Sequence, residues 1–153
     1  MAYWLFKSEP VAYSIDDLAR DGCEWWDGIR NYQARNFMCN DMQVGDEIIF
    51  YHSSCAVPAA VGRARVSATA IADVTQFDPK SDYYDASATA EKPRWHCVQI
   101  AFVEKFPQPL TLAAMRAMPK LAEMKLLARG NRLSILPLTP KDWKIILAAT
   151  GTH

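Results

Sequence analysis

The stretch AAVGRARVSATAIADV, residues 59–74, carries the strongest indication of the fold. Alanine and valine dominate it over a length that indicates one long strand, and Gly62 interrupts the pattern. A glycine inside a strand favours a bulge or a bend, which a small barrel needs. The segment from Trp95 to Phe106 predicts a second long strand, because Val98, Ile100 and Phe102 alternate onto one face. The sequence therefore predicts strongly bent strands.

Shorter patterns surround these two strands. Apolar runs predict strands over 3–6, 47–52 and 133–138. Capping residues at Ser14, Asn31 and Thr139 predict helices, with Gly22 and Gly151 ending the first and the last. Two further helices are expected near 111–118 and 120–127. The predicted class is α+β, with five or six strands in a small bent β-barrel flanked by short helices.

Length and composition define the general class of protein. The 153 residues amount to one domain, 1–153, and half of them are hydrophobic, which excludes a disordered chain. No apolar run is long enough to span a bilayer, and the N-terminus does not resemble a secretory signal, so we expect a cytoplasmic protein and no membrane partner. Seventeen basic residues balance seventeen acidic ones. Residues 101–153 are nevertheless basic, which fits either a local basic face or an ordinary solvated surface.

Motifs for metal, cofactor and nucleophile chemistry are missing. The four cysteines form no CxxC pair, and His52 with Cys55 offers too few ligands for a metal ion. Neither a G-x-S-x-G nor an H-E-x-x-H pattern occurs, and GNR at 130–132 is too poor in glycine to cradle a dinucleotide. We therefore expect no metal and no cofactor.

The sharpest feature is the pair Trp25 and Trp26. Two adjacent side chains on an extended backbone cannot both enter one core, so one of them faces elsewhere. Planar hydrogen-bonding side chains follow the pair at Arg30, Asn31, Gln33 and Arg35. An aromatic ring beside planar donors and acceptors suits a nucleobase, since stacking is worth about 1–3 kcal/mol per base. The alternative for each tryptophan is an ordinary core position.

Two polar segments add candidate contacts. Lys7, Ser8 and Glu9 follow an apolar strand, where polar groups often face a ligand, although a surface ion pair is the alternative. In the turn ARGNRLS, residues 128–134, Arg129 and Arg132 flank Gly130-Asn131. Arginines presented by a turn match phosphate geometry, and compensation of a helix dipole is the alternative.

Taken together, the sequence resembles the EVE domain family. The matching stretches run in family order: YWLFKSEP at 3–10, SIDDL at 14–18, WDGIRNYQARNFM at 26–38, VGDEIIFYHSS at 44–54, VGRARV at 61–66, TQFDPKSDYYD at 75–85, EKPRWHCVQIAFVEKF at 91–106 and RGNRLSILPLTP at 129–140. The resemblance implies a PUA-like fold, similar also to YTH domains, and a module that reads a modified base in DNA or RNA.

By the same resemblance, Trp26 falls where readers place a cage tryptophan and Asn31 where they place a base-edge contact. Lys7 and Ser8 line the same mouth. The second wall of the cage stays open between Tyr51, His52 and Ser53 on one side and Tyr83-Tyr84 on the other. Phosphate and strand contacts are expected from Arg30, Arg35, Arg129, Asn131 and Arg132. The loop CAVPAA at 55–60 departs from the polar loop that the family pattern leads us to expect.

The sequence is consistent with three functions. The first is a non-catalytic nucleic-acid-binding module whose aromatic pocket accepts a flipped-out modified base. The second is a small hydrolase acting on modified nucleosides, with Lys7, Ser8 and Glu9 as its candidate residues and a lysine that needs a depressed pKa. The third is a protein–protein adaptor that uses the same groove.

Overall fold

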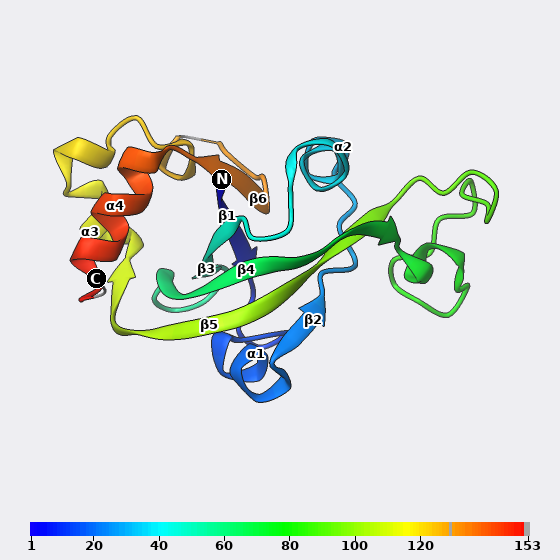
Figure 1. Cartoon of the computed structure of the whole chain (residues 1–153), viewed down its shortest axis with the longest axis horizontal. Helices are drawn as coiled ribbons and strands as arrows, with labels where there is room; N and C mark the ends of the chain where they lie inside the picture. The colour runs from blue at the N-terminus through cyan, green and yellow to red at the C-terminus, as the bar shows by residue number, and fades with distance from the viewer. Residues whose placement is uncertain (129, 152–153) are drawn as a thin grey trace.

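A computed structural model describes residues 1–128 and 130–151 (Figure 1). Its centre is one six-stranded mixed sheet with the strand order β2-β5-β4-β3-β1-β6. Within the described chain, β1 pairs in parallel with β3, and the other neighbours are antiparallel. The strands are β1 (Tyr3–Ser8), β2 (Cys23–Trp25), β3 (Glu47–His52), β4 (Ala59–Ala72), β5 (His96–Thr111) and β6 (Ile135–Leu138).

The two longest strands, β4 and β5, bend as they cross the molecule (Figure 1). Register shifts interrupt their pairing at several points, one of them between Ala60 and Gly62. A Cβ atom on Gly62 would lie 2.6 Å from both the Glu104 carbonyl oxygen and Ile15 Cδ1, so only glycine fits where the strand meets the first helix. The predicted bend at Gly62 is confirmed. The sheet stays open between β2 and β6 rather than closing into a full barrel.

Alternation along the strands creates two cores, one on each face of the sheet. Trp4 and Phe6 on β1 join one cluster, whereas Leu5 between them joins the other. On the first face lie α1 (Ile15–Asp21), α2 (Tyr32–Asn36) and a π-helical turn at Phe37–Asp41. On the second lie α3 (Leu112–Arg116), α4 (Pro140–Ala149) and short 3₁₀ turns at Pro119–Leu121 and Lys125–Leu127.

Helix starts follow their local sequence closely. The Ser14 hydroxyl accepts from the Asp17 backbone N–H, the Asp17 carboxylate accepts from the Ser14 N–H, and Gly22 ends α1. Thr139 caps α4 in the same way through the Asp142 backbone N–H. The predicted class, α+β with five or six strands and short flanking helices, is confirmed, and the strands number six in the described chain.

One helix prediction is wrong. Residues 120–127 form two 3₁₀ turns, because the chain is extended at Met124 between them. Leu121, Met124 and Leu126 are all buried in the second core, and their spacing cannot lie on one face of an α-helix. Tertiary packing has overridden the helix propensity of this segment.

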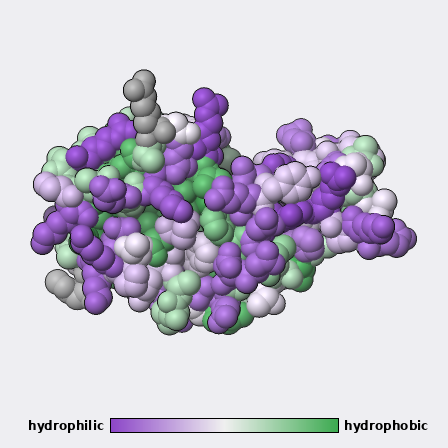
Figure 2. Space-filling view, turned by 90° about the horizontal axis from the view of Figure 1, so that it is seen from above, coloured by the Kyte–Doolittle hydropathy of each residue, from purple (hydrophilic) through white to green (hydrophobic). Residues whose placement is uncertain are grey.

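The long segment between β4 and β5 leaves the body of the protein as a lobe. It starts with a 3₁₀ turn at Val74–Phe77 and continues without regular structure to β5. Figure 2 shows its surface as largely hydrophilic, and Figure 1 shows it far from α3 and α4. The predicted loop over 76–93 is confirmed in this lobe.

Candidate functional site

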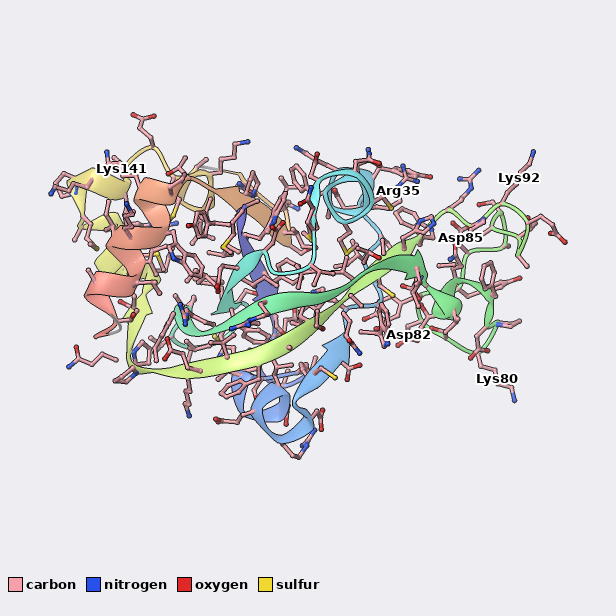
Figure 3. The ribbon with its side chains drawn as sticks, in the orientation of Figure 1. Arg35, Lys80, Asp82, Asp85, Lys92 and Lys141 are labelled. Carbon is pink, nitrogen blue, oxygen red and sulfur yellow. The ribbon has the colours of Figure 1, made fainter. Side chains whose placement is uncertain are left out.

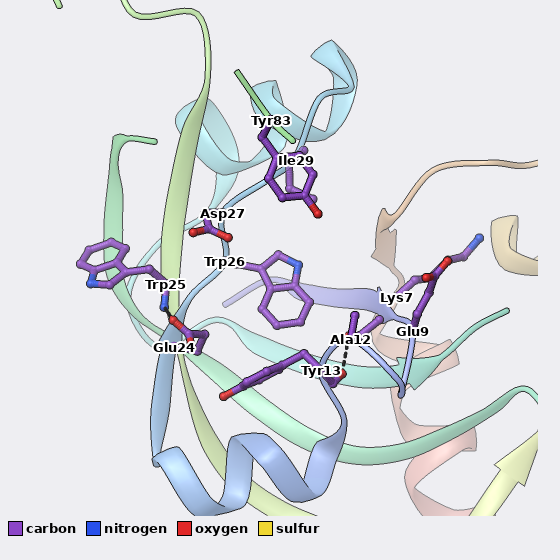
Figure 4. A pocket seen from close by; sticks show the side chains of 12 residues that line it. Lys7, Glu9, Ala12, Tyr13, Glu24, Trp25, Trp26, Asp27, Ile29 and Tyr83 are labelled. Carbon is purple, nitrogen blue, oxygen red and sulfur yellow. Dashed lines mark hydrogen bonds between the residues drawn. The ribbon is translucent and has the colours of Figure 1, made fainter. Parts of the chain in front are cut away.

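An open cavity of about 510 Å³, which we call the Trp26 cavity, lies between β1, the segment after β2 and the long loop (Figure 4). Its lining comes from residues 7–9, 12–13, 24–29 and 83. Three segments far apart in sequence thus meet at one opening. Its size lies within the range of small-molecule sites, about 300–1,000 Å³.

Trp26 forms the cavity's inner wall. The residue is only 9% exposed, and its ring packs at 5.8 Å from Phe6 and 5.6 Å from Phe50, measured between ring centroids. Tyr13 meets it edge-on at 6.0 Å. Among the described residues, the indole N–H of Trp26 has no hydrogen-bond partner, yet it is not sealed from solvent. Trp26 is therefore a core residue with one polar edge open to the cavity.

Trp25 behaves differently from its neighbour. Its backbone belongs to β2 and pairs with Gln99 of β5, and its indole points away from Trp26 (Figure 4). The extended backbone at this point separates the two side chains, as the sequence predicts. Both residues line the cavity, but the Trp25 ring points away from the Trp26 ring that forms the inner wall.

Charges in the Trp26 cavity are mostly negative. Glu9, Glu24 and Asp27 line it, and Lys7 is the cation at its rim. Burial lowers the pKa of Lys7. Partial burial raises the pKa of Asp27, and the nearby carboxylates of Asp73 and Glu24 raise it further. This lining disfavours a phosphate and favours a neutral ligand that carries hydrogen-bond donors.

A second aromatic group, the Trp95 cluster, lies where the long loop leaves the body. Trp95 stacks on Tyr32 with centroids 4.7 Å apart, and its indole N–H donates to Asp85 at 2.8 Å. The Arg30 and Arg35 guanidinium carbons lie 5.3 and 6.0 Å from the Trp95 ring. Figure 3 labels Arg35 on α2 and Asp85 in the loop, on the two sides of this junction. The protein's own side chains fill this cluster.

Asp73 links the cluster to the cavity. This carboxylate has no exposed side-chain surface and accepts from the Gly28 backbone N–H at 2.8 Å and from Arg30 at 3.1 Å. Burial alone would raise its pKa, but hydrogen bonds from Thr75, Gly28 and Arg30 outweigh burial and lower it. Arg30 also donates to the Tyr83 carbonyl at 2.7 and 3.0 Å. Arg30 therefore holds the loop that carries Tyr83 over the cavity.

Comparison with known proteins identifies the family. The EVE domain model matches residues 2–149. The chain belongs to the EVE domain family. Thymocyte nuclear protein 1 of Danio rerio is 38% identical over 166 residues, which covers 95% of this chain and 70% of that protein.

Two solved structures resemble this EVE domain over almost their whole length. A protein from Pseudomonas syringae is 47% identical, with a TM-score of 0.93 over 97% of this chain and 99% of that chain. Human THYN1 protein in complex with 5-methylcytosine-containing DNA is 34% identical, with a TM-score of 0.93 over 100% of this chain and 99% of that chain.

Only some of the site residues predicted from the sequence lie together in the structure. Lys7, Ser8 and Trp26 line the Trp26 cavity, as does Tyr83 from the second candidate wall. Tyr51, Ser53 and Asn131 line a different cavity of about 340 Å³, which Lys7 shares. Arg129 lies outside the described residues.

The remaining nominated residues lie at neither cavity. Asn31 caps α2 through the Ala34 backbone N–H at 3.0 Å. Arg30 and Arg35 belong to the Trp95 cluster. Arg132 is exposed and lines neither cavity. The geometry therefore gives Arg30 and Asn31 structural tasks, and their expected contacts with phosphate and base stay predictions.

Sequence reasoning missed Tyr13, Glu24 and Asp27, which also line the Trp26 cavity. Tyr13 lies three residues after Pro10, in a turn whose Ala12 and Tyr13 N–H groups both donate to the Glu9 carbonyl. That turn places the Tyr13 ring against Trp26. Asp27 adjoins Trp26 in sequence, so a carboxylate next to a cavity tryptophan was the available signal.

Other chemistry finds little support in the described part of the chain. His52 accepts the Ile15 backbone N–H at 3.1 Å through Nε2, so this nitrogen is not available to Cys55. Burial raises the pKa of the Cys97 thiol to about 12. Residues 1–128 and 130–151 contain no group of three or more metal-ligating side chains and no helix that could cross a membrane. The cytoplasmic location stays a prediction.

Proposed function

We propose that this EVE domain binds DNA and holds one methylated base, turned out of its stack, in the Trp26 cavity. Family membership and the similarity to human THYN1, whose structure is a complex with 5-methylcytosine-containing DNA, support DNA as the ligand. The observation that carries the proposal for this chain is the open cavity beside Trp26, with an indole N–H that no described residue accepts.

The lining matches the edge of a cytosine. The exocyclic amine of the base donates to a carboxylate, and Asp27 and Glu24 offer such acceptors at the cavity wall. The ring carbonyl and ring nitrogen of the base accept, and the Trp26 N–H is a donor without a partner among the described residues. Burial of a methyl group against the aromatic wall strengthens binding by about 0.8 kcal/mol.

Tyr83 covers the opening from the other side. It is 46% exposed, and its ring lies so close to Gly28 that a Cβ atom there would be 2.8 Å from Tyr83 Cζ. In the proposed complex the base enters between Trp26 and Tyr83. Tyr83 is thereby the favoured second wall among the alternatives that the sequence leaves open.

The test measures binding of matched oligonucleotides that carry one 5-methylcytosine or one cytosine, by fluorescence anisotropy. Wild type is expected to prefer the methylated strand. Trp26→Phe, which keeps an aromatic core residue and removes the N–H, is expected to lose most of that preference. Trp25→Phe is the matched control, because its ring points away from Trp26, and it should retain the preference.

Two results would contradict the proposal: equal binding of both strands by wild type, or an unchanged preference in Trp26→Phe. The corresponding RNA strands, measured in parallel, test RNA as the nucleic acid. A protein–protein adaptor would show no change in tryptophan fluorescence with any nucleotide or strand.

A hydrolase acting on modified nucleosides is the second candidate. The lowered pKa of Lys7, caused by burial, is the observation that favours it, because a catalytic lysine must lose its proton. Against it, the Ser8 hydroxyl donates to the Tyr13 carbonyl and is not free to attack. Turnover of acylated or alkylated nucleosides, detected by mass and abolished in Lys7→Ala, would establish this activity.

A further inference from the structure

The smaller cavity, which we call the Tyr51 cavity, lies at the ends of β1 and β3. Lys7 and Tyr51 are register partners on these parallel strands, so both side chains start from the same face of the sheet. Arg116 at the end of α3 also lines the cavity, together with Ala128, Gly130 and Asn131. The Asn131 side chain donates to the Lys125 carbonyl and accepts from the Leu133 N–H.

The Tyr51 side chain indicates that this cavity can bind a ligand. Tyr51 is 2% exposed and its ring belongs to the second core. Its hydroxyl has no partner among residues 1–128 and 130–151, and it is not sealed in the interior, so it opens into this cavity. A hydroxyl at the wall of a cavity is free to donate a hydrogen bond to an oxygen atom supplied from that cavity.

The charges at this cavity are all positive. Lys7 and Arg116 are the charged residues in its lining, and no carboxylate is among the described residues there. Neither cation forms an ion pair within the described chain. Burial raises the pKa of Tyr51, and the positive charge of Arg116 opposes that rise. The two side chains therefore interact electrostatically. The Trp26 cavity, with three carboxylates, has the opposite character.

We infer that the Tyr51 cavity binds a phosphate group through Lys7, Arg116 and the Tyr51 hydroxyl. The inference rests on the proposed function, in which this phosphate belongs to the strand beside the base in the Trp26 cavity. Lys7 lines both cavities and marks the point where the strand passes from one to the other. A free phosphate or a nucleoside monophosphate offers the same chemistry from another source.

The experiment removes the contacts one at a time. Arg116→Ala changes an exposed helix end, and Tyr51→Phe keeps the buried ring while removing its hydroxyl. Lys92→Ala, in the lobe far from α3, removes one positive charge as a matched control (Figure 3). Arg116→Ala is expected to weaken binding of methylated and plain strands by the same factor, about tenfold. Its slope of log affinity against log salt should fall by about one. Tyr51→Phe should weaken both strands equally by a smaller factor.

A neutral methylphosphonate linkage next to the modified base identifies the source. It should weaken wild type more than Arg116→Ala, because that variant has already lost one of the three contacts with the phosphate. If wild type binds no DNA, the proposed function fails, and inorganic phosphate becomes the deciding probe. Thermal stabilisation of wild type by phosphate over chloride at equal ionic strength, lost in Arg116→Ala, would then support a site for free phosphate.

The inference is overturned if Arg116→Ala binds DNA as tightly as Lys92→Ala. It is also overturned if Arg116→Ala changes the preference for the methylated strand instead of the overall affinity, since the residue would then act in base recognition. A wild type that responds to neither phosphate source would overturn it as well.

Discussion

The two aromatic groups of this EVE domain are built from similar parts but differ in what completes them. In the Trp95 cluster, Tyr32 stacks on the indole, two arginines lie over the rings and Asp85 accepts the indole N–H. Beside Trp26, the aromatic neighbours meet the ring tilted or edge-on, and no described residue accepts its N–H. The first group is complete within the protein, whereas the second has one face and one donor turned to an open cavity.

The difference shows why aromatic composition alone does not locate a binding site. A planar ligand and a planar arginine or tyrosine side chain satisfy a tryptophan by the same contacts. Hydrogen bonds from Ser87 and Trp95 lower the pKa of the Asp85 carboxyl to about 2, so this acceptor stays ionised and occupied. An open cavity beside the ring, rather than a concentration of rings, therefore distinguishes Trp26 from Trp95.

Replacing the Trp95 ring should produce the largest effect on stability. Trp95→Ala is expected to lower the free energy of unfolding by about 3–5 kcal/mol, because it leaves a void and removes the Tyr32 stack. Denaturant unfolding followed by circular dichroism measures the loss. At a temperature where the variant is folded, it should still prefer the methylated strand, because the Trp95 cluster has no place for a ligand.

Trp95→Phe is the matched variant for this prediction. It retains an aromatic ring against Tyr32 and loses the hydrogen bond to Asp85, so a smaller loss of about 1 kcal/mol is expected. If either folded variant bound both strands equally, the distinction between a filled and an open aromatic group would be wrong.

Asp73 links the Trp26 cavity to the Trp95 cluster, and removing its charge should have the second-largest effect on stability. Asp73→Asn keeps the shape but leaves Arg30 without its counter-ion, with an expected loss of about 1.5–3 kcal/mol. Because hydrogen bonds outweigh burial and hold the pKa of Asp73 below its ordinary value, the unfolded chain binds more protons in acid. The stability that Asp73 contributes is present above about pH 4 and is lost as the pH falls further.

Unfolding of wild type and Asp73→Asn, measured at neutral pH and in acid, checks the direction of this pH dependence. The difference in stability between the two proteins should shrink as the pH falls below about 4. A constant difference across this range would mean that the Asp73 charge does not stabilise the junction.

The parts of the fold that depend on neighbours in sequence were predictable. The capping residues at Ser14 and Thr139 and the bend at Gly62 all appear as expected. The strand β2 was not predicted, because three residues carry no pattern and the strand exists only by pairing with β5. The helix expected at 120–127 failed for the related reason that distant packing decides its shape.

The candidate site was predictable to a similar degree. The resemblance to the EVE family implies that Trp26, Lys7 and Ser8 lie at one mouth, and all three line the Trp26 cavity. It cannot show that Arg30 and Arg35 serve Trp95, because that ring is far away along the chain and a ligand would suit both arginines equally well. The separation of Tyr51 into its own cavity is likewise a property of the strand register alone.

The smallest effect is expected from replacing Gly28, where the backbone lies close to the Tyr83 ring. Its φ is +79° and a Cβ atom would lie 2.8 Å from Tyr83 Cζ, whereas Gly22 has a φ of +80° and open space around the same position. Gly22→Ala should therefore cost only the backbone strain, about 1 kcal/mol. Gly28→Ala should cost about as much, because the exposed Tyr83 ring can move aside, but it should also weaken binding of the methylated strand. Equal binding by the two alanine variants would show that Tyr83 is not a wall of the cavity.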